Sequence, residues 1–295
     1  MYKAERKYQI MDHVILLFCS IVTILPFILM LSSSFSSENS LVRFGYSFFP
    51  KEVSLEAYQY LLSNIQTIGR SYLITVAVTV VGTTLGVLFT ICLAYPLSME
   101  DMPMRKTISF LIFFTMLFNG GLVPTYMLYA GTFNLRNTFL ALLLPNLFVN
   151  AFQIILARSF FQTSIPKEIL ESARVDSAGE FRILLQIVLP MTKPIIATLV
   201  LMKGLSYWND WTNGLYYINN ENLYGIQHLL NIMLQNIKAM QSSTNMAEGA
   251  SALAHMPTTA VRMAIAVIVI IPIAAIYPFL QKYFVKGVMV GALKG

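Results

Sequence analysis

Charged residues are scarce in this sequence. Asp, Glu, Lys and Arg together make up 12% of the 295 residues, whereas soluble globular proteins contain roughly 25%. Hydrophobic residues make up 56%, and the mean hydropathy is +0.65. A soluble chain of this length could not bury so much apolar surface. The composition therefore excludes a soluble globular protein and indicates a protein that lies in a membrane.

Several patterns that carry chemistry are also missing. The sequence has no G-x-x-x-x-G-K-[ST] loop for nucleotide phosphates, no H-E-x-x-H and no C-x-x-C. His13, His228 and His255 are isolated, and the two Cys residues lie in apolar runs, so no metal site or disulfide framework is predicted. Proton-coupled pumps place ionisable residues within their helices, and here only Lys203 and Asp210 lie there. We therefore expect no catalytic residue, metal ligand or cofactor in this chain, and an energy source on a partner.

Six apolar segments are long enough to cross a bilayer. About 20 helical residues span the hydrocarbon core, and runs of this length without alternation are not barrel strands. The segments cover residues 14–31, 71–97, 107–135, 137–157, 194–214 and 259–281. The sequence thus predicts an all-α membrane protein with six spans, in which an N-terminal segment of residues 1–13 precedes a transmembrane domain over residues 14–295. A signal peptide is the alternative for the first run, but no A-x-A-like site follows it.

The Lys and Arg residues predict the orientation of the spans. Six spans place both termini on one side, and that side carries about two-thirds of the 20 Lys and Arg residues. The positive-inside rule makes this side cytoplasmic. The connection 158–193 and the tail 282–295 are then cytoplasmic, while the connection 215–257 is external. The net charge of +6 reflects this topology, so no nucleic-acid partner is predicted.

The cytoplasmic connection contains the most polar stretch of the chain, residues 168–190. Its spacing predicts a short amphipathic helix, with Ser164 as the N-cap and Gly179 as the residue that ends it. The two faces are formed by Ile165, Ile169, Leu170, Ala173 and Ser177, and by Lys167, Glu171 and Arg174. Such a helix either lies on lipid headgroups or docks against another protein through its small residues, and spacing alone does not separate these possibilities.

The residues of this stretch resemble a known signature. Glu171-Ser172-Ala173, Asp176 and residues 187–190 (Ile-Val-Leu-Pro) are similar to the EAA loop of ATP-binding cassette (ABC) importer permeases. That signature reads roughly E-A-A, three residues, Gly, nine residues, I-x-L-P. The spacing matches, but Ser172 replaces an Ala and Ser177 replaces the Gly, so we expect Gly179 to serve the turn. In that family the loop carries a coupling helix that docks on the ATPase subunit. The resemblance implies ATPase-coupling roles for Ile169, Leu170, Glu171, Ala173, Arg174, Asp176, Ser177 and Gly179.

Other segments are similar, in chain order, to carbohydrate-type ABC permeases. They are residues 49–58, 119–124, 207–211 and 283–295, the last of which resembles the C-terminus of the maltose-type second permease. The resemblance implies the type I importer permease fold in the bacterial cytoplasmic membrane and a pathway for oligosaccharides or polysaccharide fragments. It also implies a second homologous permease, two cytoplasmic ATPases that bind ATP and Mg²⁺, and an extracytoplasmic solute-binding lipoprotein. The alternatives are a secondary carrier, an ABC permease for a non-sugar solute, and a scaffold without a transport role.

The fifth apolar segment is the candidate lining of the sugar pathway. Residues at positions 203, 207, 210, 211 and 214 recur at helical spacing on one stripe. Aromatic faces stack on the C–H surfaces of sugars, while amide, carboxylate and amine groups bond their hydroxyls. The predicted pathway residues are Lys203, Tyr207, Asn209, Asp210 and Trp211. The alternative is that this stripe packs against the second permease.

The external connection predicts a second amphipathic helix. Its apolar stripe is formed by Ile226, Leu229, Leu230, Met233 and Ile237, and its polar face by Gln227, His228, Asn231, Gln235 and Asn236. A flexible run over residues 242–254 is expected to follow. The resemblance to maltose-type permeases implies that this connection reaches the binding protein, and the alternative is that it lies flat on lipid headgroups.

Overall fold

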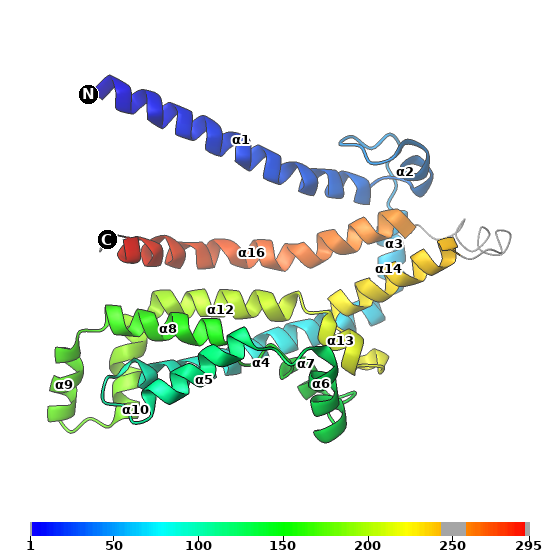
Figure 1. Ribbon diagram of the computed structural model, residues 1–295. Coiled ribbons are helices and arrows are strands. Elements are labelled where there is room, and N and C mark those ends of the chain that lie inside the picture. The colour runs from blue at the N-terminus through cyan, green and yellow to red at the C-terminus, as the bar shows by residue number, and fades with distance from the viewer. Residues whose placement is uncertain (1, 243–257, 293–295) are drawn as a thin grey trace. The chain divides into compact units, whose positions relative to one another are not determined.

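The computed structural model describes residues 2–242 and 258–292 (Figure 1). The regular elements in these ranges are helices, and the only extended pairing there is an isolated antiparallel bridge between Ser36 and Val53. The chain forms two compact units. The first consists of residues 1–68 and 230–274, and the second of residues 69–229 and 275–295.

Three long helices coincide with predicted spans. They are α1 (Tyr2–Ser34), α4 (Ile65–Ser98) and α16 (Thr258–Ala292). They enclose the first, second and sixth apolar segments, and α16 continues through most of the predicted C-terminal tail. Among the described residues, two helices are long and apolar enough to cross a membrane, or up to four if each of two bent helix pairs is one span. The count of six spans stays a prediction.

The other three apolar segments are interrupted. The helices in them are α5 (Arg105–Leu117), α6 (Leu122–Tyr126), the π-helix η1 (Met127–Thr132), α7 (Phe139–Leu143), α8 (Ala151–Ser164), α12 (Lys193–Trp208) and α13 (Thr212–Tyr217). The chain bends by 116° between α5 and the α6–η1 helix. Continuous helices over 107–135, 137–157 and 194–214 are therefore wrong. Hydropathy counts apolar side chains and does not register where the backbone turns.

The polar stretch of residues 168–190 forms a helix–turn–helix segment between α8 and α12 (Figure 1). Its elements are α9 (Lys167–Val175), α10 (Glu180–Ile183), the π-helix η2 (Leu184–Val188) and α11 (Leu189–Met191). Pro166, at the N-cap of α9, follows α8 closely, so Ser164 ends α8 and the prediction that it caps the next helix is wrong. The run from α10 to α11 meets α12 at 86°.

The core of the second unit joins this polar segment to the apolar helices. α5 and α12 both pack against α8. Fully buried small and aliphatic side chains come from α4, α8, α10, η2 and α12, namely Ala94, Ala157, Ile183, Val188 and Leu199. Small residues such as the two alanines allow the helix backbones to approach closely, which is how helices associate where lipid removes the hydrophobic driving force.

In the first unit, the segment after α1 is tied to the start of α16. It contains α2 (Glu38–Phe44) and α3 (Glu56–Ser63). The carboxylate of Glu38 accepts hydrogen bonds from the backbone N–H groups of Thr259, at 2.9 and 3.0 Å, and Ala260, at 3.0 Å. The first N–H groups of a helix lack intrahelical partners, so an acidic side chain there caps the helix and meets the positive end of its dipole.

Candidate functional site

The structure shows which face of α9 the chain itself covers. Ala173 is 8% exposed and belongs to the core that contains Tyr95 and Ile183, and Leu170 packs against the same core. On the other side, Val175 is 84% exposed. The prediction that Ala173 lets another protein approach is therefore wrong, because that small side chain lets α9 approach its own core.

The outward surface of α9 and α10 combines apolar and acidic side chains. Besides Val175, the exposed apolar residues are Ile169, at 39%, and Phe181, at 70%. The carboxylates of Glu171 and Asp176 are exposed as well. The two acids and Ile169 were predicted from the sequence, but Val175 and Phe181 were not. Both could have been found, because each is a large apolar side chain in a segment that is otherwise polar.

Ser177 makes the turn after α9. Its φ is 60°, and it occupies the position where the EAA signature has Gly. The N–H of Ser177 bonds the carbonyl of Arg174 at 2.9 Å, and the N–H of Ala178 bonds that of Ala173 at 3.0 Å. This pair of bonds is the Schellman ending of a helix, whose left-handed residue is usually Gly. The prediction that Gly179 serves the turn is wrong, because Gly179 has an ordinary φ of −66° and caps α10.

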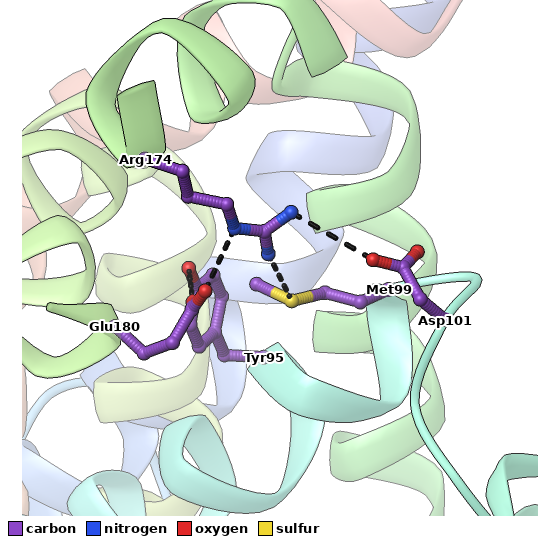
Figure 2. Close-up of polar contacts among 5 residues, drawn as sticks. All are labelled: Tyr95, Met99, Asp101, Arg174 and Glu180. Atoms are coloured by element: carbon purple, nitrogen blue, oxygen red, sulfur yellow. Dashed lines mark hydrogen bonds and ion pairs between the residues drawn. The ribbon is translucent and has the colours of Figure 1, made fainter. Parts of the chain in front are cut away.

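Arg174 lies at the centre of a polar cluster that joins three segments (Figure 2). Its Nε donates to Oε1 of Glu180 at 2.7 Å, and its Nη2 donates to the sulfur of Met99 at 3.0 Å. Its Nη1 lies 3.7 Å from Oδ2 of Asp101. The hydroxyl of Tyr95, near the end of α4, donates to Oε2 of Glu180 at 3.0 Å. Arg174, predicted to contact an ATPase, thus has most of its donors engaged within the chain.

A second ion pair lies at the start of α9. Nζ of Lys167 lies 2.8 Å from Oε1 of Glu100, and both side chains are 67% exposed. The hydrogen bond between them lowers the pKa of Glu100 and raises the pKa of Lys167. Exposed pairs of this kind stabilise little. Glu100, Asp101 and Glu171 line a cleft of about 410 Å³ beside α9 together with Lys167 and Arg174, so the cleft carries charges of both signs.

The break between α7 and α8 is held by side chains of the fifth apolar segment. The Tyr207 hydroxyl donates to the Leu143 carbonyl at 2.9 Å, and the Asn213 side-chain amide donates to the Pro145 carbonyl at 3.0 Å. The Lys203 amine donates to the carbonyls of Leu147, at 3.2 Å, and Phe148, at 2.9 Å. These carbonyls lie at the end of a helix or in the break that follows it. Hydrocarbon contains no water that could bond them in place of a side chain. Asn146, with φ of 59°, turns the chain at this point.

Lys203 and Tyr207 reach the break through a close approach of α12 to α4. The two side chains are 1% and 2% exposed. A Cβ added to Gly86 would lie 2.5 Å from Cδ of Lys203, and one added to Gly82 would lie 2.4 Å from the ring of Tyr207. Two glycines one helical turn apart thus make room for two large side chains one turn apart. The helical spacing of Lys203 and Tyr207 was predicted correctly, but spacing alone does not show which neighbour these side chains face.

The predicted stripe does not continue beyond Trp208, where α12 ends. Oδ1 of Asp210 accepts from the N–H of Thr212, at 3.1 Å, and that of Asn213, at 3.3 Å, so it caps α13. A single helical stripe through position 214 is therefore wrong. Asn209 is exposed and Trp211 is 42% exposed. Contact of any of these residues with a sugar stays a prediction.

A cavity of about 640 Å³, which was not predicted from the sequence, lies beside the break between α7 and α8. Aromatic rings of Tyr129, Phe133 and Phe148 line it together with Asn146. The Pro-Asn pair at residues 145–146 is a turn signal that could have placed the break, since hydropathy alone does not. Aromatic walls with a few polar groups are typical of sites for small molecules.

The family profile described as "binding-protein-dependent transport system inner membrane component" matches residues 2–290. The chain belongs to this family. The permease is 36% identical over 295 residues to protein LplC of Bacillus subtilis (strain 168), with 99% of this chain and 97% of that protein covered. It is 35% identical over 291 residues to the polygalacturonan/rhamnogalacturonan transport system permease protein YtcP of the same organism, with 99% of each covered.

A solved structure shares the fold. A chain of a bacterial ABC transporter involved in the import of the acidic polysaccharide alginate matches the permease with a TM-score of 0.80 and 31% identity, over 95% of this chain and 98% of that chain. The resemblance inferred from the EAA loop is confirmed. The chain is a multi-pass bacterial inner-membrane permease with the all-helical ABC importer fold, and ATP hydrolysis belongs to a separate subunit.

The helix predicted within the connection 215–257 is α14 (Ile226–Ser242). Its first N–H, from Ile226, donates to Oγ1 of Thr75 in α4 at 2.8 Å, and Ile226 is 1% exposed. His228 is 3% exposed and meets the ring of Tyr224 edge-on at 4.7 Å, with Gly214 close by. The prediction that His228 lies on the polar face is therefore wrong. Residues 243–254 of the expected flexible run lie outside the described residues.

Proposed function

We propose that this permease forms half of the translocation pathway of an importer for acidic oligosaccharide or polysaccharide fragments. The support for the substrate class is its likeness to a permease named for polygalacturonan and rhamnogalacturonan and to a transporter that imports alginate. The second half comes from a homologous permease in a heterodimer. Two cytoplasmic ATPases bind ATP and Mg²⁺, and an extracytoplasmic binding lipoprotein delivers the sugar.

The observation that carries the coupling role is the outward surface of α9 and α10. Val175 is 84% exposed and Phe181 is 70% exposed, although both lie in a polar cytoplasmic segment. Exposed apolar side chains rimmed by acids suit a protein groove better than water. We therefore assign the ATPase contact to Ile169, Glu171, Val175, Asp176 and Phe181. Leu170 and Ala173 support this surface from within, Ser177 forms the turn after α9, and Gly179 leads into α10.

The topology follows from this assignment. With α9 in the cytoplasm, both termini are cytoplasmic, the connection of residues 215–257 is external, and six spans cross the membrane. The third to fifth spans are then built from broken helices. Broken helices are tolerated at membrane depth where their free backbone groups meet protein or line a cavity. The carbonyls of residues 143–148 meet such partners here.

For sugar contact, the structure favours the exposed members of the predicted set. Asn209 and Trp211 have accessible side chains at the end of α12, whereas Lys203, Tyr207 and Asp210 bond the backbone of this chain. The cavity lined by Tyr129 and Phe148 adds ring faces on which sugars stack. The external connection, with α14 in it, is the proposed contact with the binding protein.

The test is transport by the reconstituted importer. The permease is co-expressed with the neighbouring second permease and the ATPases, purified, and placed in vesicles with the binding protein. We expect ATP-dependent uptake of oligogalacturonate or alginate oligosaccharides, measured with labelled sugar. A Walker-type Lys variant of the ATPase is the control and should abolish uptake. Uptake that follows an ion gradient without ATP would identify a secondary carrier. ATP-dependent uptake of non-sugar solutes alone would overturn the substrate class.

A further inference from the structure

The contacts of Arg174 connect the coupling helix to the end of a long helix. Glu180 uses both of its oxygens, one for Nε of Arg174 and the other for the hydroxyl of Tyr95 (Figure 2). Tyr95 is 5% exposed and lies in the core of the second unit. The path from α9 to α4 therefore runs through two hydrogen bonds that share one carboxylate.

We infer that Arg174 is a positioning residue that locks α9 to the cytoplasmic end of α4, so that movement of α9 also moves α4. This inference rests on the proposed ATPase contact of α9. It assigns Arg174 a role different from contact with the ATPase, because its guanidinium is turned toward Glu180, Met99 and Asp101 of its own chain.

The geometry explains why such a lock is needed. The apolar side chains that α9 packs against the core are the small Ala173 and the half-buried Leu170, so apolar packing alone resists sliding weakly. A guanidinium is planar and directs its donors in fixed directions, so one Arg can hold several acceptors in a set orientation. Here it engages α10 on one side and the turn after α4, residues 99–101, on the other.

Neighbouring charged contacts lack this geometry. The Lys167–Glu100 pair is largely exposed at both partners, and a flexible ammonium fixes no orientation. Arg182 donates to Gln186 at 3.0 Å within its own helical segment, so it joins no separate elements. Arg182 is therefore a matched control for Arg174, with the same charge, the same segment and only a local bond.

The experiment measures coupling in the reconstituted importer. ATP hydrolysis and sugar uptake are followed together for Arg174→Gln, Glu180→Gln, the double variant, Tyr95→Phe and Arg182→Gln. Loss of a charge-assisted hydrogen bond predicts about a tenfold fall in sugar imported per ATP for Arg174→Gln and Glu180→Gln. The double variant should be less impaired than the sum of the two single effects, because both changes break the shared bond between Arg174 and Glu180. Arg182→Gln should match the wild type.

Tyr95→Phe separates the lock from direct ATPase contact. It removes one hydroxyl from a residue too buried to touch a partner. The lock predicts a fall in sugar per ATP with the ATPases still bound in purification. Normal coupling in Tyr95→Phe and Glu180→Gln would overturn the inference, even if Arg174→Gln failed to assemble. A wild-type complex without binding-protein-stimulated hydrolysis would instead overturn the proposed function, so the two failures are distinguishable.

Discussion

Replacing Lys203 by Met tests the role of the amine at the break between α7 and α8. Met keeps an unbranched chain of similar length, so it fits beside Gly86, where no space remains for a branched side chain. Among the residues that the structure describes, Lys203 is the only donor to the carbonyls of Leu147 and Phe148, and the substitution removes it. The expected result is a loss of stability with the fold retained.

The magnitude follows from these two bonds. A buried acceptor left without a donor costs about 1–3 kcal/mol in soluble proteins, but side-chain hydrogen bonds inside membranes average only about 0.6 kcal/mol each, with a maximum near 1.7. Two weakened acceptors therefore predict a loss of about 1–3 kcal/mol. At about 2–4 °C per kcal/mol, the scaling of soluble domains, the melting temperature falls by roughly 2–12 °C.

The assay is thermal unfolding of the purified permease in detergent, followed by the fluorescence of Trp208 and Trp211. Lys193→Met is the matched control, since Lys193 is exposed at the first position of the same helix, and it should leave the melting temperature unchanged. Uptake by each variant is measured in parallel. An unchanged melting temperature together with a raised KM for the sugar would refute the reasoning and return Lys203 to the substrate pathway.

Three other predictions concern Ser177, the two faces of α9, and His228. Ser177→Gly removes a side chain from a left-handed position and should stabilise the permease by about 1 kcal/mol, seen as a higher melting temperature, whereas Gly179→Ala should have little effect. Ala173→Trp overfills the core under α9 and should reduce the yield of folded permease. Val175→Asp should keep the yield of folded permease and lower the amount of ATPase that co-purifies. Equal yields for the two variants would contradict the faces assigned to α9. Burial lowers the pKa of His228 below 6.5, so the unfolded chain takes up the proton first. The stability that His228 contributes is present above about pH 6.5 and is lost as the pH falls through the lowered pKa; melting temperatures from about pH 8 to pH 5 should show this loss, and His228→Gln should remove that part of the pH dependence.

The long helices could be predicted because spanning a bilayer is a matter of length and composition. The apolar runs of α1, α4 and α16 can be identified directly from the side chains in the sequence. The breaks could not be predicted in this way, because they depend on where backbone groups find partners. Asn146 and its neighbours form a turn, and their carbonyls bond side chains more than 50 residues away in the sequence.

Helix α9 shows the same division. Its existence and amphipathic character follow from spacing, but a helical face does not reveal which of two surfaces it meets. Ala173 could equally have faced a partner or the core, and only tertiary packing decides between them. Ser177 was unexpected for a related reason. Its left-handed φ is set by the bonds that end α9, and these override the ordinary preference of Ser.

The contact between Glu38 and the start of α16 has a consequence for biosynthesis. The two partners are separated by 221 positions in the chain. At about 5–20 residues per second, the ribosome completes Glu38 roughly 10–45 s before it completes Thr259. During that interval the start of α16 is not yet available to the Glu38 carboxylate. The segment after α1 therefore reaches its final structure only when the first turn of α16 has been made, long after its own synthesis.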